Sequence, residues 1–176
     1  GDSAAVTVNN IPLISTVTLS DDPIVSTQDT TLTCTIDRSD VDGHTVTSDF
    51  VWKDGAGTPF VTSSTAGTDQ TIDVQAYVNN GTLDEGEEVV CEVTPDDGLE
   101  SGDAKNADTN INNRPVIDAM AITFDIDAYC NVGLSDDADG DGVTFTYRWT
   151  VNGGGNHTGN TLSITYFGIG DQLICY

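Results

Sequence analysis

An internal repeat constrains this chain more than any other feature of its sequence. The segment 6–14, which contains Asn-Asn-Ile-Pro, returns 103 residues later with Asn-Asn-Arg-Pro at the same place. Cys34 recurs at an offset of 96, and Trp52 recurs at an offset of 97. Unrelated residue types that recur at nearly one offset indicate two copies of one structural unit. The fall in offset from 103 to 97 indicates a deletion early in the second copy.

The length of the repeat predicts the domain organisation. About 100 residues is the usual size of an immunoglobulin-like β-sandwich, which packs two antiparallel sheets face to face. We therefore expect one sandwich over residues 11–113 and a second over residues 114–176, with Asn-Asn-x-Pro at the junction. Residues 1–10 match the final strand of the first copy, so they are assigned to an orphan final strand of a preceding or neighbouring domain. The second copy lacks that strand within the chain.

Alternating apolar residues predict an all-β fold with almost no helix. Leu32, Cys34 and Ile36 share one face of a predicted strand, and threonines occupy the other face. Residues 72–76 show the same period of two. The alternation is longest in the second copy, where it predicts one continuous strand over residues 143–151.

Each copy carries a cysteine, a tryptophan and a second cysteine, in an order that resembles the pattern of immunoglobulin-like domains. The two sets are Cys34, Trp52, Cys91 and Cys130, Trp149, Cys175. Four cysteines allow three pairings. Because each copy should bond within itself, the repeat selects Cys34–Cys91 and Cys130–Cys175, each over a core tryptophan. The alternatives are free buried thiols or a metal site, but no Cys-x-x-Cys is present. Disulfides imply an oxidising compartment.

Further motifs surround these residues, and two of them, Asp-x-Asp-Gly and Asn-Asn-x-Pro, occur in both copies. The motifs are Leu-Thr-Cys, Asp-x-Asp-Gly, Thr-Pro-x-Asp-Gly and Asn-Asn-x-Pro. Together they resemble the tandem immunoglobulin-like or PKD-like repeats of large secreted bacterial surface proteins, over essentially the whole chain. The resemblance implies an extracellular or cell-surface location and a structural role in a stalk, an adhesin shaft or a fibre. The first copy departs from the pattern at residues 78–86, an insertion before the strand of its second cysteine.

The unmatched ends of the chain allow two interpretations. In one, the chain is a stretch of a longer tandem array. In the other, residues 1–8 complete the open second sandwich of a neighbouring subunit, because an unpaired strand edge is a template for a strand from another chain. Such a head-to-tail contact does not close and so builds a filament. In both cases the expected partners are copies of this chain or adjacent repeats.

The charge excludes several classes of protein. The chain contains five Lys and Arg residues and 29 Asp and Glu residues, which gives a formal net charge of −24. Nucleic acids and anionic membranes are themselves negative, so we expect neither nucleic-acid binding nor membrane insertion. The sequence also lacks an apolar run long enough to span a bilayer. None of the common catalytic or nucleotide-binding fingerprints is present, so we expect no enzyme activity.

The acidic loops are candidates for calcium sites. Alternating carboxylates in a glycine-containing loop can converge on one hard cation. The candidate ligands are Asp40, Asp42, Asp96, Asp97, Asp137, Asp139 and Asp141. We predict that Ca²⁺ bridges successive domains and stiffens the array, and we expect no other cofactor. The alternative is that Asp-Gly serves turn chemistry and the carboxylates point into water.

The rival function is an adhesin or carbohydrate-binding module of a larger secreted protein. Such modules present exposed aromatic side chains, whereas Trp52 and Trp149 are predicted core residues. The remaining aromatic candidates are Tyr77, Phe167 and Tyr176. Two N-glycosylation sequons, at Asn80 and Asn156, lie in loop-like sequence.

Overall fold

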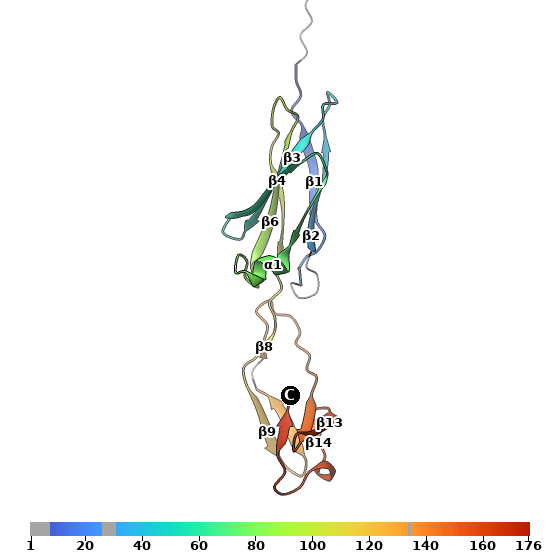
Figure 1. The fold of residues 1–176 in the computed structure, drawn as a ribbon, viewed down its shortest axis with the longest axis vertical. Coiled ribbons are helices and arrows are strands. Elements are labelled where there is room, and N and C mark those ends of the chain that lie inside the picture. The colour runs from blue at the N-terminus through green and yellow to red at the C-terminus, as the bar shows by residue number, and fades with distance from the viewer. Residues whose placement is uncertain (1–7, 26–30, 134) are drawn as a thin grey trace, which may run out of the picture. The chain divides into compact units, whose positions relative to one another are not determined.

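The computed structural model describes residues 8–25, 31–133 and 135–176 of the 176-residue chain (Figure 1). The chain divides into two compact units, Gly1–Asn112 (unit 1) and Asn113–Tyr176 (unit 2). This division lies one residue before the boundary expected from the repeat. Apart from two short helices, the regular elements in the described residues are strands, which confirms the predicted all-β class.

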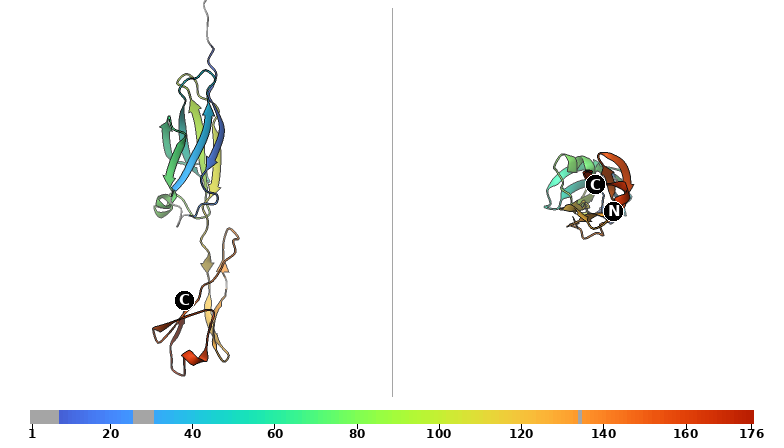
Figure 2. Two further views of the ribbon diagram at one scale, coloured as in Figure 1. Left: turned by 90° about the vertical axis from the view of Figure 1, so that its right-hand side faces the viewer. Right: turned by 90° about the horizontal axis from the view of Figure 1, so that it is seen from below.

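Unit 1 contains two antiparallel sheets (Figure 2). The first has the order β1-β2-β5, formed by β1 (Leu13–Leu19), β2 (Thr31–Ser39) and β5 (Asp69–Asp73). The second has the order β4-β3-β6-β7, formed by β3 (Thr47–Asp54), β4 (Pro59–Thr65), β6 (Glu88–Asp96) and β7 (Lys105–Asn110). Leu32, Cys34 and Ile36 of β2 are buried and alternate with more exposed residues, as the period of two predicts.

A disulfide joins the two sheets of unit 1. Cys34 on β2 is bonded to Cys91 on β6 with an S–S distance of 2.17 Å, which is the pairing that the repeat selects. Trp52 on β3 lies opposite Cys91 in the β3–β6 pairing and is fully buried. The inward faces of both sheets thus meet around the disulfide and the tryptophan in one apolar core.

The segment after β5 is a helix, so the predicted strand over residues 72–76 is wrong beyond Asp73. β5 ends at Asp73, and α1 (Val74–Asn79) follows directly. The Asp73 carboxylate accepts a hydrogen bond from the backbone N–H of Ala76 at 3.2 Å, which is the usual role of an aspartate at a helix N-cap. Val74 remains buried, because one turn of helix also turns it into the core.

Unit 2 repeats the strand order of unit 1. One sheet has the order β14-β10-β9, formed by β9 (Met120–Phe124), β10 (Ala128–Val132) and β14 (Thr161–Leu162). A second has the order β13-β12-β15, formed by β12 (Arg148–Val151), β13 (Gly154–Thr158) and β15 (Leu173–Cys175). A short pair joins β8 (Val116–Ile117) to β11 (Ser135–Asp136), and the 3₁₀ helix η1 (Ile164–Tyr166) precedes β15. In chain order the first two sheets correspond to β5-β2-β1 and β4-β3-β6 of unit 1.

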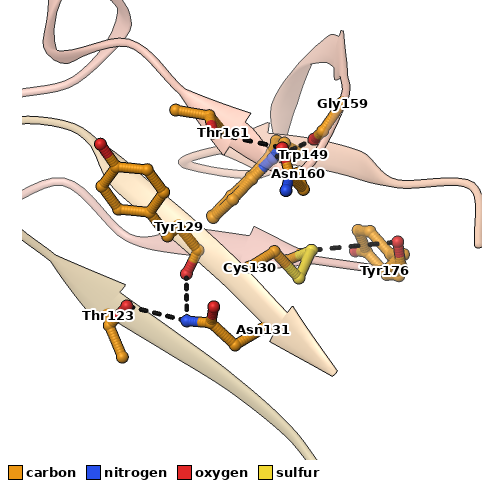
Figure 3. The surroundings of a disulfide bond; sticks show 10 residues. Thr123, Tyr129, Cys130, Asn131, Trp149, Gly159, Asn160, Thr161 and Tyr176 are labelled. Carbon is orange, nitrogen blue, oxygen red and sulfur yellow. Dashed lines mark hydrogen bonds between the residues drawn. A yellow bond between two sulfur atoms is a disulfide. The ribbon is translucent and has the colours of Figure 1, made fainter. Parts of the chain in front are cut away.

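The disulfide of unit 2 occupies the equivalent place (Figure 3). Cys130 on β10 is bonded to Cys175 on β15 at 2.01 Å. Trp149 lies opposite Cys175 in the β12–β15 pairing, as Trp52 lies opposite Cys91 in unit 1. The Trp149 indole is fully buried, and its Nε1 donates a hydrogen bond to the backbone oxygen of Gly159 at 2.9 Å.

The long strand predicted over residues 143–151 is shorter in the structure. Only Arg148–Val151 is a strand, although Val143, Phe145 and Tyr147 are still more buried than the residues between them. Alternation needs a partner to become a ladder, and β15 pairs with residues 149–151 alone. The orphan strand assigned to residues 1–10 lies mostly outside the described residues. Of the three that are described, Val8 is 79% exposed, and 8–10 form no strand.

Candidate functional site

The Asp-x-Asp-Gly motif forms the same turn in both units. In unit 1, the backbone N–H of Gly43 donates to the oxygen of Asp40 at 3.4 Å. In unit 2, the N–H of Gly140 donates to the oxygen of Asp137 at 3.0 Å. Both glycines have positive φ angles, 76° and 80°, which other residues adopt at a cost. The glycine and the first aspartate of the motif therefore serve the turn.

The second aspartate of the motif accepts hydrogen bonds from the second asparagine of Asn-Asn-x-Pro in the same unit. Asp42 accepts two hydrogen bonds from Asn10, from its backbone N–H at 2.5 Å and from its side-chain Nδ2 at 2.7 Å. Asp139 accepts the same two bonds from Asn113, at 2.5 Å and 2.8 Å. We call this contact the Asn–Asp clamp. It joins the Asn-Asn-x-Pro motif to the acidic loop of the unit that follows it.

The donors of the clamp also set the charge state of the acceptor. The Asn10 backbone N–H, followed by the Asn10 side chain, lowers the pKa of Asp42 below its usual value, because both donors stabilise the ionised carboxylate. Asp42 is thus held in its charged form by amide groups. Two of the predicted calcium ligands, Asp42 and Asp139, already have polar partners for both carboxylate oxygens.

Asp97 is the most strongly held carboxylate of unit 1. Its side chain is fully buried. It accepts bonds from the backbone N–H groups of Glu100 at 2.7 Å and Leu99 at 2.8 Å, and from Asn9 Nδ2 at 2.9 Å. These bonds, that of Glu100 first, lower the pKa of Asp97 to about 2. His44 Nδ1 lies 3.6 Å from the second oxygen of Asp97.

Asp40, His44 and Asp97 form the one group in the described residues whose side chains could share a metal ion. Their ligand atoms lie within 4.8 Å of one another. Oδ2 of Asp40 is buried without a hydrogen-bond partner. Two carboxylates and an imidazole suit a transition metal such as Zn²⁺ better than Ca²⁺, which prefers oxygen ligands only.

The remaining predicted ligands are spread over local turns. Asp96 accepts bonds from the N–H of Gly98 and from Ser101 Oγ. Asp137 accepts a bond from the N–H of Asp139 at 3.1 Å. Asp137, Asp139 and Asp141 do not gather into a ligand group of the kind that Asp40 and Asp97 form with His44, within the part of the chain that the structure describes. The calcium prediction stays a prediction.

Both sequon asparagines are exposed, but the loop expected around Asn156 is wrong, because that residue lies on a strand. Asn80 caps the C-terminus of α1 and is exposed, and Asn156 is exposed on β13. Trp52 and Trp149 are fully buried. Of the three remaining aromatic candidates, Tyr77 and Phe167 are half-buried, and only Tyr176 is exposed. Tyr176 lies under the Arg148 guanidinium, 4.5 Å from the centre of the ring.

Sequence reasoning missed the partners of these carboxylates. Asn9, Asn10 and Asn113 appeared only as part of the junction motif, and His44 was not among the candidates. The signal was present, because Asn-Asn-x-Pro and Asp-x-Asp-Gly repeat together at offsets of 103 and 97. Two polar motifs that recur as a pair are candidates for a mutual contact.

No protein-family model matches the sequence, and no curated protein matches it. Among the described residues, no helix combines the length and the apolar character needed to cross a membrane.

Proposed function

We propose that this chain is a structural component of an extracellular filament or surface stalk built from tandem immunoglobulin-like domains. The observation that carries the proposal is that the tryptophan and the cysteine strand pair in the same register in both units. Trp52 faces Cys91 and Trp149 faces Cys175, in sheets of the same strand order, and each cysteine is bonded across to the other sheet. Two similar units in one chain are the minimal element of an array.

The Asn–Asp clamp supports the same proposal. In each unit it fixes the segment that enters the domain to the acidic loop, through a backbone and a side-chain bond. A clamp of this kind limits how freely the connecting segment can turn at each domain. Limiting that freedom is what a stalk or fibre needs in order to keep its direction over many domains.

Two disulfides also fit an oxidising environment, so we place the protein outside the cytoplasm. Immunogold electron microscopy of the producing cells, with antibodies raised against unit 1, tests the role. We expect gold particles along surface fibres or stalks at regular spacing. Label confined to the cytoplasm, or scattered over the surface without any appendage, would contradict the proposal. A glycan-binding screen of the chain distinguishes this role from that of a carbohydrate-binding module. A carbohydrate-binding module would bind a glycan saturably, and a structural component would not.

Calcium remains part of this proposal as a separate hypothesis. If the acidic loops bind Ca²⁺, its addition raises the melting temperature of the chain, and Mg²⁺ at the same ionic strength does so less. Asp40→Asn should reduce the effect, because it removes a carboxylate with a buried and unpartnered oxygen. Equal rises in melting temperature with Ca²⁺, Mg²⁺ and added NaCl would show that general charge screening, and not a calcium site, causes the effect.

A further inference from the structure

Asp40, His44 and Asp97 meet where one strand from each sheet of unit 1 ends. β2 ends at Ser39 and Asp40 follows it, while β6 ends at Asp96 and Asp97 follows it. His44 lies four residues after Asp40, in the turn of the Asp-x-Asp-Gly motif. One ligand atom of each side chain lies within 4.8 Å of those of the other two. The fold therefore brings two carboxylates and an imidazole to one point.

Backbone N–H groups hold one oxygen of each carboxylate and leave the other oxygen for a different partner. Oδ1 of Asp97 accepts bonds from the N–H groups of Leu99 at 2.8 Å and Glu100 at 2.7 Å. Oδ1 of Asp40 accepts a longer bond from the N–H of His44, at 3.3 Å. Oδ2 of Asp97 lies 3.6 Å from Nδ1 of His44. Hydrogen bonds of this kind orient the carboxylates that bind metal ions in proteins.

Two oxygens of this site are buried and accept no hydrogen bond. They are Oδ2 of Asp40 and Oδ1 of Asn9. The Asn9 side chain belongs to the same site, because its Nδ2 donates to Oδ2 of Asp97 at 2.9 Å. A buried oxygen without a donor destabilises the fold, and a charged one does so most strongly. A cation among these side chains would supply the missing partner of both oxygens.

The site also holds negative charge away from water. The Asp97 side chain is fully buried, and His44 is the one basic side chain that the described residues place within ion-pair distance of it. Ionised carboxylates are costly to bury unless positive charge compensates them. The imidazole can offer one positive charge at most, whereas a divalent cation offers two.

The ligand atoms select among divalent cations. Ca²⁺ and Mg²⁺ prefer oxygen ligands, whereas Zn²⁺ takes imidazole nitrogen and carboxylate oxygen together in a tetrahedron. Ligand atoms around a tetrahedral Zn²⁺ are about 3.3 Å apart. The 3.6 Å between Nδ1 of His44 and Oδ2 of Asp97 is close to that separation. No free cysteine is present to compete for the ion.

We propose that unit 1 binds one transition-metal dication such as Zn²⁺ through Nδ1 of His44 and one oxygen each of Asp40 and Asp97, with Oδ1 of Asn9 as the fourth ligand. A cleft of about 290 Å³, lined in part by Asn9 and His44, opens beside the site. The ion joins the segment that enters unit 1 to the loops that follow β2 and β6. This inference goes beyond the proposed structural role, and it differs from the calcium hypothesis because it makes His44 a ligand.

Unit 2 has a different residue at the position of the histidine. The repeat offset of 97 aligns Asp40 with Asp137 and His44 with Asp141. Within the described residues, Asp137 and Asp141 do not belong to a group that could share an ion. We therefore expect one Zn²⁺ in each chain, bound by unit 1.

Calorimetric titration of the oxidised chain with Zn²⁺ tests the site, in millimolar Mg²⁺ to occupy exposed carboxylates. His44→Ala should weaken Zn²⁺ binding by about a hundredfold or more, because outer partners of metal ligands alone are worth up to about that factor. The His44 side chain is 43% exposed, so its loss should leave the metal-free melting temperature nearly unchanged. His157→Ala removes the other histidine of the chain and is the matched control.

A second pair of variants separates a ligand from general charge. Asp40→Asn and Asp103→Asn each remove one negative charge, but Asp103 is exposed and lies outside the site. Asp40→Asn should weaken Zn²⁺ binding at least tenfold, and Asp103→Asn should leave it unchanged. His44→Asp replaces the nitrogen ligand with oxygen, so it should lower the affinity for Zn²⁺ and raise that for Ca²⁺.

Nitrogen-15 NMR of the two imidazole rings identifies the ligand atom. Zn²⁺ should shift the Nδ1 resonance of His44 and leave the resonances of His157 in place. Three results would overturn the proposal: Zn²⁺ binding no tighter than that of Mg²⁺, equal losses in His44→Ala and His157→Ala, or displacement of Zn²⁺ by an equal concentration of Ca²⁺. Immunogold labelling tests the structural role independently of any of these results.

Discussion

Units 1 and 2 arrange the same strand order around a disulfide and a tryptophan, yet their cores differ greatly in size. Among the described residues, fourteen buried residues form the core cluster of unit 1, and five form that of unit 2. Two of the five are the bonded cysteines. The disulfide and the tryptophan therefore make up a larger share of the core in unit 2 than in unit 1, which has many aliphatic side chains from both sheets.

The final strand of unit 1 supplies part of its larger core. In unit 1, β7 brings Thr109 and Ile111 into the core and covers the edge of β6. A small domain gains stability mainly from the apolar area that it buries, so the smaller described core of unit 2 should make it the less stable unit.

Removing the disulfides should give the largest difference in stability between the two units. Chain-entropy reasoning gives about 4 kcal/mol for each bond, because their loops are similar, with sequence separations of 57 and 45. Unit 2, with residues 113–176, has a total stability on the order of 6 kcal/mol at typical values per residue. We expect Cys130→Ala with Cys175→Ala to leave unit 2 with only about 2 kcal/mol of stability, so its melting temperature falls far more than that of unit 1.

The same double change at Cys34 and Cys91 should lower the melting temperature of unit 1 without unfolding it at 25 °C. Calorimetry with hydrogen exchange of each unit measures both effects. Equal losses in the two units would mean that the difference in core size has no energetic consequence.

The two tryptophans offer a finer comparison. Replacement by Phe removes ring volume in both units and should cost about 1–3 kcal/mol. Trp149→Phe also removes the hydrogen bond to Gly159, worth about 1 kcal/mol, whereas Nε1 of Trp52 is buried without a partner. We therefore expect the larger loss in unit 2, measured by chemical denaturation. A larger loss from Trp52→Phe would contradict this ranking.

The Asn–Asp clamps should behave alike, because their bonds are nearly the same. Asn10→Ala and Asn113→Ala each remove one side-chain bond, of 2.7 Å and 2.8 Å, and keep the backbone bond. We expect a small fall in melting temperature and faster hydrogen exchange in the adjacent acidic turn of each unit. Asn106→Ala, at an exposed position of β7, is the control. An effect confined to one unit would show that the clamps differ in role.

The last comparison is the dependence of stability on pH that Asp97 produces, which is small near neutral pH because Asp97 stays ionised there. Its pKa of about 2 lies below the usual 3.8, so the folded state favours the ionised form. The stabilisation is complete above about pH 4 and is lost as the pH falls toward 2, because the unfolded state binds the proton more readily. Asp97→Asn should reduce this loss of stability in acid for unit 1 and leave the pH dependence of unit 2 unchanged.

Thermal unfolding between pH 5 and 2, followed unit by unit, measures that dependence, with Asp103→Asn as an exposed control. If Asp97→Asn loses stability in acid as the wild type does, the loss comes from other carboxylates, such as Asp42.

The repeat determined much of this protein directly from its sequence. The offsets of the cysteines and tryptophans were sufficient for the two disulfide pairs and for the tryptophan that lies opposite one cysteine of each pair. Such features follow from the sequence because equal spacings in two copies must satisfy one geometry. The acidic loops were also found from Asp-x-Asp-Gly, but their chemistry was not, since a carboxylate's partner is invisible until the chain folds back on it.

Only the tertiary structure decided what the local pattern left open. The alternation at Ile72 and Val74 continued into a helix, because Asp73 caps Ala76. The alternation at Val143 and Phe145 has no partner strand among the described residues. Asn10 and Asp42 are 32 residues apart in sequence and meet only through the fold. Local periods and repeats are properties of the chain, whereas partners, caps and open edges depend on which segments the packing brings together.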